Sequence, residues 1–156
     1  MYLLIFTMFL IGCSDSNLQT PDKLFDLGIE FRKNDNLRLS ITNFKKIIEN
    51  YPKSTFAAKS HYQIADIYLN DINNYQFALK EFELLINSYP NAELAKKSSF
   101  MVAYIYSNYL DEYSRAIDKY KFFLKKYPED ELVPSVIYEL EGLKKYEVTI
   151  DSLKKL

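Results

Sequence analysis

The sequence is poor in the residues from which most catalytic and metal sites are built. Its 156 residues include one cysteine, one histidine and no tryptophan, and its only glycines are Gly12, Gly28 and Gly142. A structural zinc site needs about four Cys or His ligands, and a lone cysteine cannot close an internal disulfide. Glycines this far apart cannot form a phosphate-binding loop. We therefore expect no cofactor and no metal.

Neither sign of charge dominates the chain. Lysine and arginine number 20 against 21 aspartates and glutamates, a formal net charge of −1. A nucleic-acid binder needs a basic face that neutralises phosphates, so we expect no nucleic acid as partner. With 48% hydrophobic residues, the chain can bury a core, and its length indicates one domain or a few repeats of a solenoid.

Candidate catalytic groups are equally scarce. The single histidine, His61, has no nucleophile and orienting carboxylate at a useful spacing, and we interpret it as a helix-surface or packing residue. The acidic pairs Glu81/Glu83 and Glu139/Glu141 are two residues apart, so each pair is divided between helix faces and is interpreted as solvated. The sequence therefore favours a protein that is not an enzyme.

The first residues form a segment of their own. Residues 2–12 read YLLIFTMFLIG and carry no charge. As a helix they span about 16 Å, roughly half of the ~30 Å hydrocarbon core of a bilayer. That length is too short for a transmembrane helix and is typical of the apolar region of a signal peptide. The alternative is an N-terminal apolar helix with an incidental buried cysteine.

The residues that end this segment, Leu10-Ile11-Gly12-Cys13, resemble the lipobox of bacterial lipoproteins. The resemblance implies a signal peptide at 1–12, cleavage before Cys13, a diacylglycerol on the Cys13 thiol and a tether over 13–20. Several acyl chains would give stable membrane anchoring. The usual basic residues before the apolar run are missing. Ser14 resembles the outer-membrane sorting choice of enterobacterial lipoproteins, so we expect a lipid-anchored protein at the periplasmic face of the outer membrane.

The rest of the chain repeats with a period of 38 residues. Tyr-Pro occurs at Tyr51-Pro52, Tyr89-Pro90 and Tyr127-Pro128. Other residue classes recur in phase with these corners, in the sets Leu24/Tyr62/Phe100/Tyr138, Leu27/Ala65/Ala103, Ser40/Ala78/Ala116 and Phe44/Phe82/Tyr120. We divide the chain into three units, 21–52, 53–90 and 91–128, followed by a partial unit with a cap over 129–156.

Each unit is predicted to be a pair of helices. Apolar residues three and four apart mark both helices, and each proline ends the second one. We expect Ser54 to cap the first helix of the second unit and Asp111 to cap the second helix of the third. In the last unit we expect one helix over Val133 to Tyr146 and a separate short capping helix over Val148 to Leu156, as terminal repeats are atypical.

This pattern of aromatic and small residues in a helix-turn-helix unit resembles the tetratricopeptide repeat, although that repeat usually has 34 residues and a tryptophan at the first aromatic position. The resemblance implies an all-α, right-handed solenoid of about three and a half repeats. Tyr51-Pro52 and the following spacing resemble a narrower group, lipoproteins typified by BamD of the outer-membrane β-barrel assembly machinery and the Tol-Pal-associated cell-division coordinator. That likeness implies protein or peptide partners in the cell envelope.

Function in such a solenoid is expected on the concave surface formed by the first helices. The candidate groove residues lie off the core stripe of each first helix: Phe25, Ile29, Arg32, Gln63, Ile67, Asn70, Met101, Ile105 and Asn108. The asparagines could bind the backbone of an extended peptide above an apolar floor. The alternatives are that these residues only pack against the neighbouring helix, or that the solenoid is a structural spacer.

Overall fold

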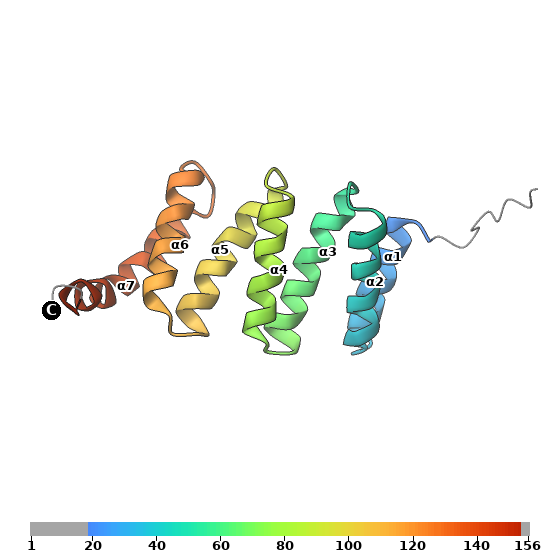
Figure 1. The fold of residues 1–156 in the computed structure, drawn as a ribbon, viewed down its shortest axis with the longest axis horizontal. Helices are drawn as coiled ribbons and strands as arrows, with labels where there is room; N and C mark the ends of the chain where they lie inside the picture. Colours follow the sequence, from blue (N-terminus) through green and yellow to red (C-terminus); the bar gives the residue numbers. More distant parts are fainter. Residues whose placement is uncertain (1–18, 154–156) are drawn as a thin grey trace, which may run out of the picture.

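The computed structural model describes residues 19–153, and every regular element in that range is helical. The elements are α1 (Pro21–Lys33), α2 (Leu37–Asn50), α3 (Thr55–Asp66), the π-helical turn η1 (Ile67–Asp71), α4 (Tyr75–Ser88), α5 (Glu93–Asn108), α6 (Tyr113–Lys126) and α7 (Val133–Leu153). Consecutive helices pack against each other as hairpins, which lie in a row from α1 and α2 at one end to α7 at the other (Figure 1). The all-α prediction is confirmed.

The period of 38 residues is visible in the backbone. Asp35, Asn73 and Asp111 adopt left-handed φ angles of 57°, 58° and 53°, each two residues before a second helix begins. Asn and Asp tolerate this conformation better than other non-glycine residues. Asp111 is therefore not the N-cap that the sequence suggested; the cap position belongs to Glu112. Three turns of the same geometry place the three second helices equivalently.

The core of each hairpin is an aromatic contact between its two helices. Phe44, Phe82 and Tyr120 are fully buried at equivalent positions of α2, α4 and α6. The rings that pack on them belong to the first helix of the same unit, with centroid distances of 5.2 Å (Phe25–Phe44), 5.5 Å (Tyr62–Phe82) and 5.8 Å (Phe100–Tyr120). Rings of this size bury a large apolar area and so contribute strongly to the hydrophobic stabilisation of each hairpin.

These contacts correct the sequence alignment of the first unit by one residue. The partner of Phe44 is Phe25, not Leu24, and the small residue at the closest approach is Gly28, not the half-buried Leu27. A Cβ atom on Gly28 would lie 2.6 Å from the Phe44 ring, and the Ser40 hydroxyl donates to the Gly28 carbonyl over 2.7 Å. Gly28 thus takes the place that alanine has in the later units.

The last unit differs from the prediction of two helices. α7 runs from Val133 to Leu153 without a break, so no separate capping helix begins at Val148. Gly142, in the middle of α7, does not interrupt it. Val136 and Leu143 are buried and belong to the core formed with α6, whereas Tyr138 is 76% exposed and Glu141 is also exposed. α7 therefore packs on one side only.

The predicted signal peptide (1–12) and the predicted lipidation site Cys13 lie outside the described residues. Within residues 19–153, no helix has both the length and the apolar character that crossing a bilayer requires. The first described contact of the tether segment is at Gln19, whose carbonyl accepts a hydrogen bond from the Tyr51 hydroxyl over 2.9 Å. This bond ties the start of the helical region to the first Tyr-Pro corner.

Candidate protein-binding site

Two of the predicted groove residues are core residues. Ile67 and Ile105 have no exposed surface, and each sits where a first helix contacts its neighbours. Their carbonyls accept five-residue backbone bonds, from Ile72 N–H over 3.0 Å and from Leu110 N–H over 3.2 Å. Both residues lie three positions after a buried residue, Ile64 or Val102, and so continue the stripe that packs against the preceding unit. The prediction that they form the floor of a groove is therefore wrong, and packing is their role.

The predicted groove residues of α1 divide between core and surface. Phe25 and Ile29 are half-buried and pack on the core between α1, α2 and α3. The Phe25 ring lies 5.2 Å from Phe44 and 5.3 Å from Phe56, so it fills the junction of the first two units. Phe25 is thus a packing residue, because the first unit is shifted by one position. Neither residue presents a full side chain to a partner.

Arg32, Gln63 and Asn70 come together in one polar network. The Arg32 guanidinium bonds to the carboxylates of Asp66 at 2.6 Å and Asp71 at 2.7 Å, and donates to the Gln63 amide oxygen at 3.2 Å. The Asn70 amide donates to Asp66 over 2.9 Å. Burial alone would lower the pKa of Arg32, but the bonds and charges of Asp71 and Asp66 outweigh it and raise that pKa. The network links α1 to α3 and η1.

Met101 and Asn108, the remaining groove candidates, do not join a network. Met101 is half-buried against the core of the second unit. Asn108 is exposed, and its amide donates to the Tyr104 carbonyl one turn earlier over 3.2 Å. The two repeated asparagines, Asn70 and Asn108, therefore have different surroundings. Their role in peptide binding stays a prediction.

His61 and Glu81 form a buried pair that the sequence did not indicate. His61 Nδ1 lies 2.8 Å from Glu81 Oε2, and the two side chains are 8% and 12% exposed. The interpretation of His61 as a packing residue agrees with this position, but Glu81 is not solvated as we expected. The histidine supplies the hydrogen-bond partner that a buried carboxylate needs. The pair joins α3 to α4 within one hairpin.

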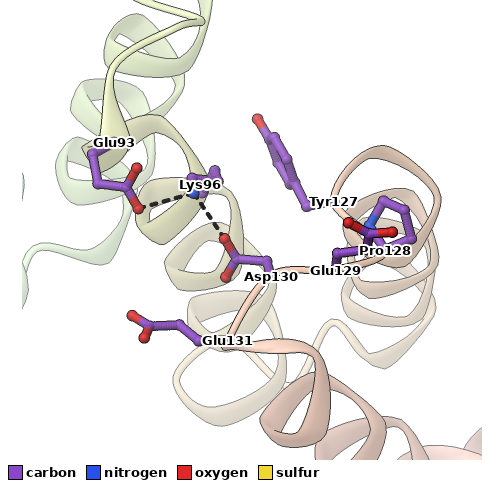
Figure 2. Close-up of a pocket in the computed structure, with 7 residues that line it drawn as sticks. All are labelled: Glu93, Lys96, Tyr127, Pro128, Glu129, Asp130 and Glu131. Atoms are coloured by element: carbon purple, nitrogen blue, oxygen red, sulfur yellow. Dashed lines mark ion pairs between the residues drawn. The ribbon is translucent and has the colours of Figure 1, made fainter.

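The structure reveals hollows at two Tyr-Pro corners, and the sequence does not predict a site at either corner. The corner at Tyr127-Pro128 borders a hollow of about 530 Å³ between the start of α5 and the loop before α7 (Figure 2). Its lining residues are Glu93, Lys96, Tyr127, Pro128, Glu129, Asp130 and Glu131. Four carboxylates and one ammonium group thus line the hollow, which suits a cation better than an anion.

Lys96 organises this acidic corner. Its Nζ lies 2.9 Å from Glu93 Oε1 and 3.0 Å from Asp130 Oδ2 (Figure 2). The Asp130 carboxylate also accepts from the Leu132 N–H over 3.0 Å, which caps the start of α7. The backbone bond from Leu132 is the main cause that lowers the pKa of Asp130, and Lys96 adds to it. Glu93 and Asp130 thus have structural roles at helix N-termini.

An equivalent hollow lies one unit earlier, at Tyr89-Pro90. Its volume is about 480 Å³, and Lys53, Lys59, Ala58 and Leu94 are among its lining residues. Ala58 and Ala92 stand here where the later corner has Lys96 and Asp130. The two corners border hollows of similar volume but differ in charge. The signal for this difference was visible in the sequence, because Glu129, Asp130 and Glu131 follow one corner and Asn91 and Ala92 the other.

One stretch of the chain matches a known family in sequence. Residues 59–92, which cover most of α3 and α4 and the loop after them, match the tetratricopeptide repeat. One hairpin of the described chain thus matches this repeat in sequence, and the other hairpins pack in the same way. No curated protein matches the chain in sequence. The tetratricopeptide fold typically serves as a protein-interaction scaffold, since stacked hairpins offer extended surfaces to other chains.

Within the described residues, no group of three or more His, Cys, Asp or Glu side chains is placed to hold a metal ion. The accessible polar features include the Arg32 network, which joins α1 to α3 and η1, and the two corner hollows. Both suit contacts with another polypeptide: guanidinium, carboxylate and amide groups can bind its backbone and side chains. Of the residues predicted to line one continuous groove, only the polar ones therefore remain candidates for binding a partner.

Proposed function

We propose that this chain is a non-enzymatic scaffold, anchored by a lipid on Cys13, that binds protein or peptide partners at the periplasmic face of the outer membrane. One observation supports it: a lipobox-like sequence at Leu10-Ile11-Gly12-Cys13 precedes a tetratricopeptide-type solenoid by a short polar tether. Lipidation would hold the solenoid at the membrane with two or three acyl chains. The hairpins would then present their surfaces to partners in the envelope.

The specific role we propose is that of BamD, in the assembly of outer-membrane β-barrel proteins. It rests on the likeness of the Tyr51-Pro52 segment and the following helix to that group of lipoproteins. The second candidate is an adaptor of the Tol-Pal system in cell division or envelope maintenance, which the same residues resemble. Both roles need a membrane-tethered solenoid and differ in the partner protein.

Metabolic labelling with a radioactive fatty acid tests the anchor. The wild-type chain should incorporate label and fractionate with membranes, whereas Cys13→Ala should lose both. Ser14→Ala is the matched control, because it changes the adjacent residue and leaves the thiol intact. A wild-type chain that takes no label would reject the lipid anchor.

Co-purification after crosslinking in cells tests the role. Recovery of the β-barrel assembly protein with the wild type would support the BamD-like role, and recovery of Tol-Pal components would support the alternative. If neither is recovered although the chain is lipidated, the proposed role is wrong while the anchor stands.

A further inference from the structure

The open side of α7 is the place where the repeat pattern is incomplete. In three successive units, an aromatic residue of the first helix packs on a buried aromatic residue of the second helix. The equivalent aromatic of α7 is Tyr138, one period after Phe100, and it is 76% exposed. Within residues 19–153 no helix covers it. We call Ile137, Tyr138 and Glu141 the open face of α7.

Positions beside Tyr138 are likewise buried in an earlier unit and exposed in α7. His61, two periods before Ile137, is buried against α4 and bonds to Glu81. Ile137 is 45% exposed. A hollow of about 330 Å³ lies beside this face, bordered by Tyr138, Glu139, Glu141 and Gly142 of α7 and by Ser107 and Asn108 of α5. A face that is buried or half-buried in every earlier unit is thus accessible here.

The earlier units also define what covers such a face. Each second helix carries a small residue, an aromatic four positions later and an apolar residue three positions after that. The sets are Ser40/Phe44/Ile47, Ala78/Phe82/Leu85 and Ala116/Tyr120/Phe123, and all nine side chains have no exposed surface. Spacings of four and seven residues put the three on one face of a helix. This stripe is the complement of the open face.

Charge adds a further requirement. Ala65 and Ala103 occupy the position that Glu141 occupies in α7, and both are fully buried. Glu141 is exposed and forms a long ion pair with Lys144, at 3.7 Å. An exposed pair of this kind is weak, so a helix that buries Glu141 must place a closer cation beside the carboxylate to offset the lost solvation. The covering helix is therefore amphipathic and basic.

We propose that α7 binds an amphipathic, basic helix of a partner protein, which completes the fourth hairpin in the way that α2, α4 and α6 complete the first three. The inference deepens the proposed scaffold role by naming the chemistry of one partner segment. Insertion of an amphipathic helix into an apolar groove is a common recognition mode. Tyr138 is the central contact, as tyrosine is enriched among the residues that dominate binding energy.

The chain itself supplies a probe. A blocked, fluorescein-labelled peptide of residues 113–126 has the sequence YSRAIDKYKFFLKK, with five basic residues and one acidic residue. It carries the stripe of Ala116, Tyr120 and Phe123. Fluorescence anisotropy should show saturable binding to the purified full chain in detergent, with a Kd below about 1 mM. Circular dichroism should show that the peptide gains helix on binding.

Variants locate the site. Tyr138→Ser should weaken peptide binding by about tenfold or more, and Glu141→Lys should weaken it through repulsion of the basic peptide. Phe122→Ser is the matched control: Phe122 is 51% exposed on α6, outside the open face, and its loss should change the affinity less than about twofold. Thermal unfolding of each variant excludes loss of fold as the cause.

Several results would overturn the proposal. Absence of saturable binding would do so, as would equal affinity for a scrambled peptide or for Tyr138→Ser. Self-association of the chain that Tyr138→Ser abolishes would assign the open face to a second copy instead. Since the measurement needs neither lipid nor envelope proteins, its failure leaves the labelling of Cys13 and the co-purification test untouched.

Discussion

The interior hairpin of α3 and α4 and the last helix α7 share one pattern and differ in packing. In the interior, Tyr62 packs on the fully buried Phe82, and Ala65 is completely buried nearby. In α7 the corresponding residues, Tyr138 and Glu141, are exposed. The same position in the repeat is therefore a core position when a second helix covers it and a surface position when none does. Burial in a solenoid is decided by the neighbouring element as much as by the residue.

The largest contrast should come from the aromatic residues. Phe82→Ala removes a fully buried ring and should reduce the free energy of unfolding by about 3–5 kcal/mol, since the ring is lost and a cavity remains. Tyr138→Ala should change it by less than about 0.5 kcal/mol, as for other surface substitutions. Urea unfolding followed by circular dichroism measures both. Similar losses for the two variants would show that α7 is covered.

Substitution by alanine should have opposite effects on stability at Gly28 and at Gly142. Gly28→Ala places a Cβ atom 2.6 Å from the Phe44 ring, and overpacking of this kind costs about 1–3 kcal/mol. Gly142→Ala meets nothing within 4 Å and should stabilise α7 by up to about 1 kcal/mol, because alanine is the better helix former. Melting temperatures should therefore shift in opposite directions. A stabilising Gly28→Ala would contradict the close contact between α1 and α2.

Removal of a partly buried ion pair should also cost more free energy of unfolding than removal of an exposed pair on α7. The difference should be smaller than for the aromatic residues. Arg32 bonds two carboxylates and an amide at a site where its side chain is 23% exposed, so Arg32→Met should cost about 1–2 kcal/mol. Lys144 forms only an exposed pair with Glu141, and Lys144→Met should cost less than about 0.5 kcal/mol. Thermal unfolding at low and high salt separates the two. Equal salt dependence would show that the Arg32 network is no stronger than a surface pair.

The smallest effect concerns the start of α7 and its pH dependence. The pKa of Asp130 is lowered, mainly by the Leu132 N–H. Its contribution to stability is therefore complete above the usual aspartate pKa of about 3.9 and is lost as the pH falls through the lowered pKa. Asp130→Asn should remove that part of the acid dependence, and unfolding measured between pH 5 and about 2 tests it. An unchanged acid profile would show that the carboxylate does not cap α7.

The sequence predicted the hairpins because their signals are local and repeated. Each Tyr-Pro corner ends a helix by the chemistry of proline, and the aromatic stripe recurs with the helical period. The shift of Phe25 and Gly28 was missed because one residue fewer separates the helices of the first unit, which only the Phe44 contact reveals. A separate capping helix was expected from Val148 because terminal repeats are atypical, although no proline or turn residue ends the helix there.

The site was predicted less well than the fold for a physical reason. Ile67 and Ile105 lie off the stripe that packs within their own hairpin, but with Ile64 and Val102 they form a second stripe that packs against the preceding unit. Glu81 is buried because His61, twenty residues away, supplies its partner. Such contacts depend on tertiary structure, and spacing within one helix does not contain them. The polar candidates Arg32, Gln63 and Asn70 converge, but as a link between helices.

Hydrogen exchange measured by mass spectrometry on the full chain tests the central comparison most directly. Amides in the interior helices α4 and α5 should exchange slowest, and those of α7 fastest among the helices, because a helix packed on one side opens at lower cost. Addition of the peptide of residues 113–126 should slow exchange in α7 alone. Protection of α7 equal to that of α4 in the free chain would contradict the account.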